Sequence, residues 1–218
     1  YGENGEISSS GNYLNNKMDG KWIYYDENGD INKEESYKEG NYNGEWVWYY
    51  TNGNIDQKAI YKDNKLNGEY KSYFENQEEV VEWLHYYENG DITGTTTRFF
   101  EDGNIWYIGE VITLENGKAG WNGERMVYYD TGELSIEQNW ENGLQTGIHK
   151  GYYKNGHIEW LYYFDKNGKR DESKKTTRFH ENGNIWYEGF WIYLENDEMV
   201  WDGLYISYDE SGKKIKEI

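Results

Sequence analysis

The chain has 218 residues and a formal net charge of −19, from 41 acidic and 22 basic side chains. This charge makes nucleic acids and anionic lipid surfaces poor partners, because their phosphates would be repelled, and it favours a basic protein as partner. Cys is absent, which excludes a disulfide framework, a thiolate metal site and a cysteine nucleophile.

The remaining composition predicts a folded chain built from strands. Aromatic residues make up 19% of the sequence, Gly occurs 26 times and Pro is absent. Disordered chains lack aromatics, and aromatic residues with frequent glycines favour strands and tight turns over helices. No apolar run approaches the roughly 18 residues of a transmembrane helix.

The chain begins in the middle of a repeat. Residues 1–7 (Tyr-Gly-Glu-Asn-Gly-Glu-Ile) match residues 25–31 (Tyr-Asp-Glu-Asn-Gly-Asp-Ile), 24 positions later. We therefore expect that an upstream segment was removed, either a signal or lipoprotein leader or simply sequence left out of this chain. A cytoplasmic location and an envelope or secreted location both stay open.

Residues 43–61 predict a β-hairpin and supply the unit from which the chain is copied. The aromatic, β-branched run Trp46–Tyr50 meets Asn52-Gly53, a strong signal for a two-residue hairpin turn. With that turn, Tyr50 faces Ile55, Trp48 faces Gln57, Trp46 faces Ala59 and Gly44 faces Tyr61. Trp46, Trp48 and Tyr50 then share one face of the sheet, and Val47 and Tyr49 share the other.

Two periods organise the rest of the chain. Gly20, Gly44 and Gly68 are 24 residues apart, with shorter units around Gly90, Gly103, Gly168 and Gly183. A block is also duplicated 80 residues on, so that residues 94–132 correspond to residues 174–212. We expect a single repeat domain, residues 1–218, of about ten hairpin units.

An aromatic residue stands four positions before most turn positions and predicts a ladder of stacked rings in the core. A lone hairpin is marginal in water, so neighbouring hairpins must bury a continuous surface. The ladder consists of Tyr25, Tyr49, Tyr73, Tyr86, Phe99, Tyr128, Tyr152, Phe164, Phe179 and Tyr208.

A second regularity places a glycine 17 residues before an aromatic, directly opposite it in the same hairpin register. We interpret each pair as a ring lying over a cross-strand glycine. The pairs are Gly20 with Tyr37, Gly44 with Tyr61, Gly123 with Trp140, and Gly147 with Phe164.

The sequence predicts no catalytic residues, no metal site and no cofactor. His85, His149, His157 and His180 lack metal-ligand spacing. Asp26–Asp30 faintly resembles a calcium loop but lacks the spaced ligands and closing Glu of an EF-hand. No carboxylate pair stands out from the repeats as a general acid and base.

A binding surface is the remaining candidate. The positions two and four residues after the hairpin glycine vary, and their bulky aromatics gather in the N-terminal third; Arg125, His149 and Tyr205 stand there in later repeats. The alternative is a second packing layer with looser demands. The candidate binding residues are Trp22, Tyr24, Trp46, Trp48, Tyr50 and Tyr70.

Residues 19–29 and 43–53 share an Asp or Asn followed by Gly, a Trp two residues on, paired aromatics and a closing Asn-Gly. In this the chain resembles MORN-type repeat proteins of the bacterial variant, over nearly its whole length. The resemblance implies an all-β fold, an elongated and twisted antiparallel sheet of successive β-hairpins, which is non-enzymatic and contacts proteins.

Many bacterial chains of this type look like the YwqK family of antitoxins. The resemblance implies an antitoxin or immunity protein that neutralises a basic toxin through an acidic, aromatic surface. The alternative is an exported cell-surface or envelope protein that mediates adhesion or contacts host or glycan ligands, with Trp46 and Trp48 as stacking platforms.

Overall fold

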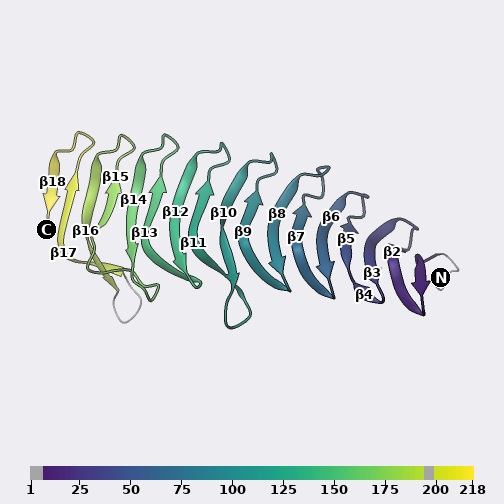
Figure 1. The fold of residues 1–218 in the computed structure, drawn as a ribbon. Coiled ribbons are helices and arrows are strands. Elements are labelled where there is room, and N and C mark those ends of the chain that lie inside the picture. Colours follow the sequence, from purple (N-terminus) through teal and green to yellow (C-terminus); the bar gives the residue numbers. More distant parts are fainter. Residues whose placement is uncertain (1–6, 194–198) are drawn as a thin grey trace. The chain divides into compact units, whose positions relative to one another are not determined.

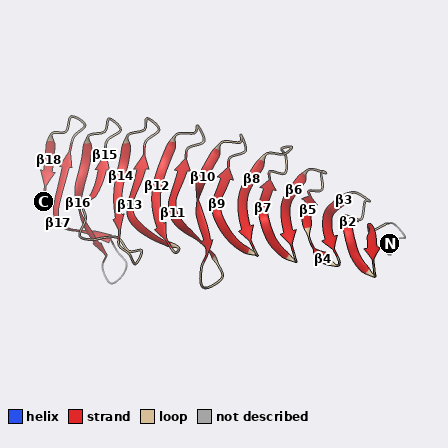
Figure 2. Cartoon of the chain, in the orientation of Figure 1, coloured by secondary structure: helices blue, strands red, loops and turns tan. Residues whose placement is uncertain are grey.

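The computed structural model describes residues 7–193 and 199–218, and every regular element in these ranges is a β-strand (Figure 2). The half-repeat at residues 1–6 lies outside the described residues. The described ranges contain no helix that is long and apolar enough to cross a membrane.

The strands follow one another in hairpins (Figure 1). In sequence order they are β1 (Ser9–Leu14), β2 (Lys17–Tyr25), β3 (Ile31–Lys38), β4 (Asn41–Tyr42), β5 (Gly44–Tyr49), β6 (Ile55–Lys62), β7 (Lys65–Tyr73), β8 (Val81–Glu88), β9 (Asp91–Phe99), β10 (Ile105–Thr113), β11 (Ala119–Tyr128), β12 (Leu134–Glu141), β13 (Leu144–Tyr152), β14 (Ile158–Phe164), β15 (Thr176–Phe179), β16 (Ile185–Tyr193), β17 (Met199–Tyr208) and β18 (Lys214–Glu217).

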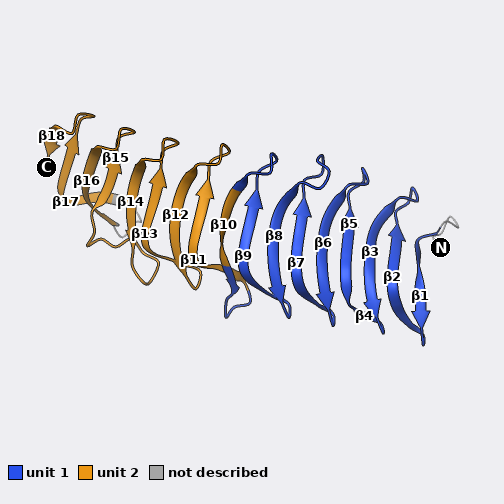
Figure 3. Ribbon diagram, turned by 45° about the horizontal axis from the view of Figure 1, so that its top comes forward, with its two compact units in different colours: residues 1–105, 111–117 blue, residues 106–110, 118–218 orange. Residues whose placement is uncertain are grey.

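The chain divides into two units (Figure 3). Unit 1 comprises residues 1–105 and 111–117, and unit 2 comprises residues 106–110 and 118–218. In unit 1 the strands from β1 to β9 pair antiparallel with their neighbours in the sequence, and the short β4 and β5 both pair with β3. In unit 2 the strands from β11 to β18 do the same. The expected all-β fold of successive antiparallel hairpins is confirmed.

Two kinds of turn alternate from β1 to β10 and again from β11 to β14. The first is a two-residue turn in which both central residues have positive φ, as the type I′ geometry requires. These turns are Asn15-Asn16, Glu39-Gly40, Asp63-Asn64, Asn89-Gly90 and Asn142-Gly143. Because alternate connections of a meander lie at opposite ends of its strands, the four of these turns that belong to unit 1 share one end of its strands.

The second kind is a three-residue loop at the other end, and Asn52-Gly53 belongs to it. Tyr50 donates its N–H to the Asn54 carbonyl at 2.8 Å, and Gly53 donates to the Tyr50 carbonyl at 3.0 Å. Only Gly53 in this loop has positive φ, +86°, which is the type I turn followed by a left-handed glycine. The predicted two-residue turn is therefore wrong.

A β-bulge after each loop restores the register. Tyr49 pairs with Ile55 but Trp48 pairs with Gln57, so Asp56 is the extra residue. The predicted pairing of Tyr50 with Ile55 is wrong, whereas the predicted pairs from Trp48 outward are confirmed. Equivalent shifts follow Tyr24, Ser72, Val127, Gly151, Arg178 and Ser207.

The predicted glycine–aromatic pairs are also confirmed as cross-strand neighbours. Their physical reason is different, because no ring atom lies within 4 Å of the position that a Cβ would take on any of the four glycines. A Cβ on Gly20 would meet no atom within 4 Å, and a Cβ on Gly44 would meet the Ser36 side chain at 2.9 Å. Gly20 has φ +77° and Gly44 has φ +113°. Glycine is needed here for its left-handed backbone.

Candidate binding faces

Strand alternation gathers rings on one face of each unit, which we call the aromatic face. In unit 1, Trp46 lies 5.6 Å from Trp48 and 4.8 Å from Tyr61 between ring centroids. In unit 1 this face contains Trp22, Tyr24, Tyr37, Trp46, Trp48, Tyr61, Tyr70, His85 and Tyr87. In unit 2 it contains Tyr107, Trp121, Trp140, His149, Trp160, Tyr162, Phe164, Tyr187, Trp201 and Tyr205.

Three residues at the same repeat position use this face to bind the backbone of the preceding strand. Trp22 donates its indole N–H to the Asn12 carbonyl at 3.1 Å, and Trp46 donates to Ser36 at 3.2 Å. His149 lies 3.0 Å from the Asn139 carbonyl through Nε2. Each acceptor lies where the strand pairing is interrupted, so these side chains complete the ladder.

Burial divides the candidate binding residues on the aromatic face into two groups. Trp22 and Trp46 are only 8% and 6% exposed, which favours the packing alternative at both positions. Tyr24, Trp48 and Tyr70 are half-buried on the same face.

Tyr50 stands apart from these residues at the loop end of the strands, where its hydroxyl donates to the Tyr73 carbonyl at 2.8 Å. Burial raises the pKa of this hydroxyl to about 12.

Glu35 is a buried carboxylate within the aromatic face of unit 1, only 3% exposed. It accepts hydrogen bonds from Lys33 Nζ at 2.6 Å and from the Tyr37 hydroxyl at 2.5 Å. Burial and then the bond to Glu35 raise the pKa of Tyr37. Lys33 also lies 4.4 Å from the Tyr24 ring centroid. The negative charge of Glu35 is thus balanced by the Lys33 ammonium and hydrogen-bonded by Tyr37, as a buried charge requires.

The other face of each unit carries ion pairs, and we call it the salt-bridge face. The pairs are Lys21–Glu34, Lys71–Glu69, Lys150–Glu137 and Lys175–Glu188. Their side chains are partly exposed, so each pair contributes little to stability.

Several members of the predicted ring ladder direct their hydroxyls to this face. Tyr86 donates to Glu69 and Tyr152 donates to Glu137. Among the ladder residues Tyr73 is buried, and Tyr25, Tyr49, Tyr86, Phe99, Tyr128, Tyr152, Phe164, Phe179 and Tyr208 are half-buried. Phe164 lies on the aromatic face instead, 4.4 Å from the His149 ring.

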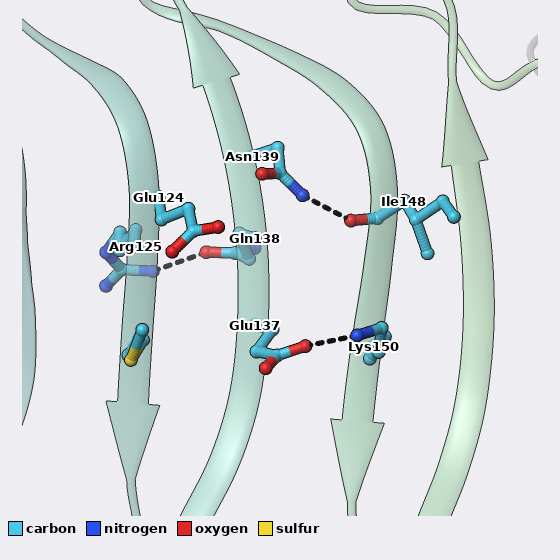
Figure 4. A pocket seen from close by; sticks show the side chains of 8 residues that line it. Glu124, Arg125, Glu137, Gln138, Asn139, Ile148 and Lys150 are labelled. Atoms are coloured by element: carbon cyan, nitrogen blue, oxygen red, sulfur yellow. Dashed lines mark hydrogen bonds and ion pairs between the residues drawn. The ribbon is translucent and has the colours of Figure 1, made fainter.

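A shallow cavity of about 290 Å³ opens on the salt-bridge face of unit 2, between β11, β12 and β13 (Figure 4). Glu137 accepts hydrogen bonds there from Lys150 at 2.6 Å and from the Tyr152 hydroxyl at 2.8 Å. The Lys150 ammonium lowers the pKa of Glu137. This carboxylate stays ionised and already has its partners, whereas Glu124, which also lines the cavity, is exposed.

Three of the four arginines of the sequence lie against aromatic rings, and the fourth, Arg178, interacts with tyrosine hydroxyls. The guanidinium carbon of Arg98 lies 4.7 Å from the Trp83 centroid, and that of Arg170 lies 3.5 Å from the Tyr162 centroid. Arg125 lies 4.6 Å from Tyr107 and 4.9 Å from Trp121. Arg178 borders Tyr162 and Tyr187. The sequence pointed to Arg125 only as a variable position.

The duplicated blocks repeat their ring geometry. The Tyr107 and Trp121 centroids are 5.7 Å apart at 81°, and those of Tyr187 and Trp201 are 5.5 Å apart at 88°. The position of Arg125 is taken by Tyr205, 4.6 Å from Trp201. The two blocks therefore share a scaffold and differ in the charge that it holds.

Neighbouring loops at the same end of the strands within each unit are joined by side-chain hydrogen bonds, which sequence reasoning missed. Asn52 and Asn54 both donate to the Glu75 carbonyl, at 2.8 and 3.0 Å. Asn182 and Asn184 bind the Glu210 carbonyl in the same way. The signal in the sequence was an Asn immediately before and another immediately after the loop glycine.

The three histidines other than His149 also lie within hydrogen-bond distance of groups elsewhere in the sheet and loops. His85 pairs with the Thr96 hydroxyl, and His157 and His180 lie within hydrogen-bond distance of the carbonyls of Glu181 and Tyr208. Residues 7–193 and 199–218 contain no cluster of three or more His, Cys, Asp or Glu side chains that could hold a metal ion.

Five of the hairpins described above match a known protein family. Residues 18–39, 42–63, 121–142, 174–193 and 201–218 match the MORN repeat variant. Each matched stretch covers one hairpin with a three-residue loop, from β2–β3 to β17–β18. Five hairpins of the chain are MORN-type repeats. The hairpins β7–β8 and β13–β14 repeat the geometry outside the matched stretches.

No curated protein matches the chain. MORN repeats generally serve as non-enzymatic scaffolds, and they are often binding scaffolds. The two faces and the loops described above are therefore the surfaces on which a partner of this protein would lie.

Proposed function

We propose that this protein is a non-enzymatic scaffold that binds and neutralises a basic protein, as a bacterial antitoxin or immunity protein does. The proposal rests on the charge of the loops in unit 1. The aromatic face supplies rings for contact beside them, and the resemblance to YwqK antitoxins supplies the biological role.

Three of the four loops of unit 1 are acidic, and the fourth, residues 50–54, is uncharged. Residues 26–30, 50–54, 74–80 and 100–104 lie at the same end of the strands and contain no Lys, Arg or His. We call this the acidic loop side; its carboxylates are Asp26, Glu27, Asp30, Glu75, Glu78, Glu79, Glu101 and Asp102. All except Asp26 are exposed. A surface of one sign steers an oppositely charged partner and raises the association rate.

The loops of unit 2 differ in this respect. Lys154, His157, His180 and Lys213 stand among their carboxylates, and Lys154 pairs with Asp130 at 3.1 Å. We therefore assign the basic partner to the loop side of unit 1.

The test is capture of partners from a lysate of the native host at low and high salt, with identification by mass spectrometry. A single basic protein that is retained at low salt and released at high salt supports the proposal. Recovery of only envelope or host-surface material would favour the exported adhesion protein instead, and recovery of nothing specific would contradict both.

A matched pair of charge variants locates the surface. The triple change Glu75→Gln, Glu78→Gln and Glu79→Gln removes three charges from the acidic loop side and should slow association. The control, Glu39→Gln, Asp63→Asn and Glu88→Gln, removes three charges at the opposite end of the same strands. Equal losses in both variants would contradict the assignment to the loops.

A further inference from the structure

Arg125 is a guanidinium that meets no carboxylate partner among the described residues, although the sequence carries 41 acidic side chains. Within the described residues its one side-chain hydrogen bond goes from Nη1 to Gln138 Oε1 at 2.6 Å (Figure 4), and it forms no salt bridge. Its Nε is buried without an acceptor, as are those of Arg98 and Arg178, but these two arginines form salt bridges. Arginine has five N–H donors in a fixed fork, so most of the N–H groups of Arg125 remain available to bind another group.

The site around Arg125 is built by close packing in unit 2. A Cβ on Gly109 would lie 3.0 Å from the Trp121 ring and 3.1 Å from the Arg125 Cβ. Glycine therefore lets Trp121 and Arg125 lie directly against β10, with Tyr107 as the second ring. Rings of this kind hold a guanidinium in a defined orientation.

A second donor on the same hairpin also lacks an acceptor. The indole Nε1 of Trp140 is buried without a hydrogen-bond partner. Trp140 follows Gln138 by two residues on β12, and Gln138 pairs directly with Arg125 across β11. Buried donors without acceptors are costly and uncommon. The Arg125 guanidinium and the Trp140 indole each have an N–H that could donate to an anionic oxygen.

The geometry points to a carboxylate-binding site formed by Arg125, Gln138 and Trp140 on the aromatic face of unit 2. The ligand is a carboxylate that the protein partner presents, either on an Asp or Glu side chain or at its C-terminus. A carboxylate matches the guanidinium fork with two parallel hydrogen bonds. The inference deepens the proposed function and rests on it for the class of partner.

The related block supplies the control. At the position equivalent to Arg125 it holds Tyr205, packed on Trp201 and Tyr187 over Gly189. Arg125→Tyr therefore places a side chain that this scaffold already accommodates 80 residues later. It removes the charge and keeps a ring in contact with Trp121.

The experiment titrates the ¹⁵N-labelled full-length protein with glutarate, and with neutral glutaramide as control, while the arginine Nε–H and tryptophan indole N–H signals are followed. The sequence has four arginines, and Arg98 and Arg178 already pair with Glu82 and Glu159. We expect saturable shifts of the Arg125 and Trp140 signals with glutarate alone. Absence of these shifts, or equal shifts of all four arginine signals, would overturn the site.

Two substitutions of Arg125 test the site further. Arg125→Tyr should abolish the shift of the Trp140 signal, and Arg125→Lys should weaken binding about tenfold by losing a charge-assisted hydrogen bond. Unchanged binding in Arg125→Lys would overturn the fork, and this variant decides the matter should Arg125→Tyr fail to fold.

Two N-acetylated tripeptides distinguish the source of the carboxylate. One has a central glutamate and an amidated C-terminus, and the other has a central glutamine and a free C-terminus. Binding of either supports the site, and binding of neither overturns it. Glutarate binding by a protein that retains no partner from lysate would contradict the proposed function and leave the site standing.

Discussion

The indole N–H of Trp46 donates to the carbonyl of Ser36 at 3.2 Å, where the pairing of β3 passes from β4 to β5. Trp22 and His149 repeat the bond ten residues back from their own positions. Each of these bonds closes a gap in the backbone ladder, which explains why the three sites are buried.

Trp46→Ala should lower the free energy of unfolding by about 3–5 kcal/mol, because it empties a buried ring site and leaves the Ser36 carbonyl with one bond fewer. Trp48→Ala, at a half-buried position, should cost less. Urea unfolding followed by circular dichroism measures both. A Trp46→Ala protein as stable as the parent would show that this ring is a contact surface and not packing.

Gly44→Ala should destabilise the protein more than Gly20→Ala. Both glycines have positive φ, so an alanine at either position costs about 1–2 kcal/mol of backbone strain. At Gly44 the new methyl would also lie 2.9 Å from the Ser36 Cβ, whereas at Gly20 it meets nothing within 4 Å. The same unfolding assay compares them, and equal losses would mean that Ser36 yields without cost.

His149 should make stability depend on pH. Burial lowers the pKa of this imidazole below its ordinary value of 6.5. Below about pH 6.5 the unfolded protein binds a proton at this histidine that the folded protein takes up only at lower pH. The contribution of neutral His149 is therefore complete above that pH and declines as the pH falls through it.

The measurement is the free energy of unfolding at a series of pH values for the parent and for His149→Gln. The variant should lose part of the decline on the acid side. His85, whose pKa burial also lowers, accounts for part of the remaining slope. Identical slopes in the parent and the variant would show that His149 does not titrate differently in the two states.

Asn182→Ala should loosen the link between two loops of unit 2. It removes a hydrogen bond of 2.7 Å to the Glu210 carbonyl, worth about 0.5–1.5 kcal/mol. Amide hydrogen exchange should then rise in residues 209–213. Asp102→Ala is the matched control, because Asp102 precedes a loop glycine and accepts the Asn104 N–H as Asn182 accepts that of Asn184, but its carboxylate has no N–H to donate to a neighbouring loop. An equal response in both variants would contradict the link.

Pattern alone predicted most of the strand pairing. Trp48 opposite Gln57 and Gly44 opposite Tyr61 were expected from alternation and spacing and are confirmed. Asn52-Gly53 was misassigned because Asn-Gly suits a two-residue turn and also the end of a three-residue loop. The bulge at Asp56 compensates for the difference, so the error stayed within the residues next to the loop.

The two faces could not be ranked from the sequence, because rings occur on both. The ring ladder was expected to form the core, yet most of its members are half-buried, and the packing depends on Trp22 and Trp46. Trp22 and Trp46 differ from the ladder residues because each donates an indole N–H to a carbonyl of the neighbouring strand. The Ser36 carbonyl accepts two hydrogen bonds, from the Asn43 N–H and from the Trp46 indole, beside an interruption of the strand pairing.

By itself the sequence determined the fold class, the hairpin repeat, the duplicated block and the net charge, because spacing and composition express these directly. Only the tertiary structure decided which rings are buried, how the loops are joined and which charges lack partners among the described residues. Those properties depend on bulges that turn side chains across strands, and on contacts between repeats. Arg125 shows the difference: its place in the repeat is legible in the sequence, but its unfilled guanidinium fork becomes visible only once the neighbouring strands are in position.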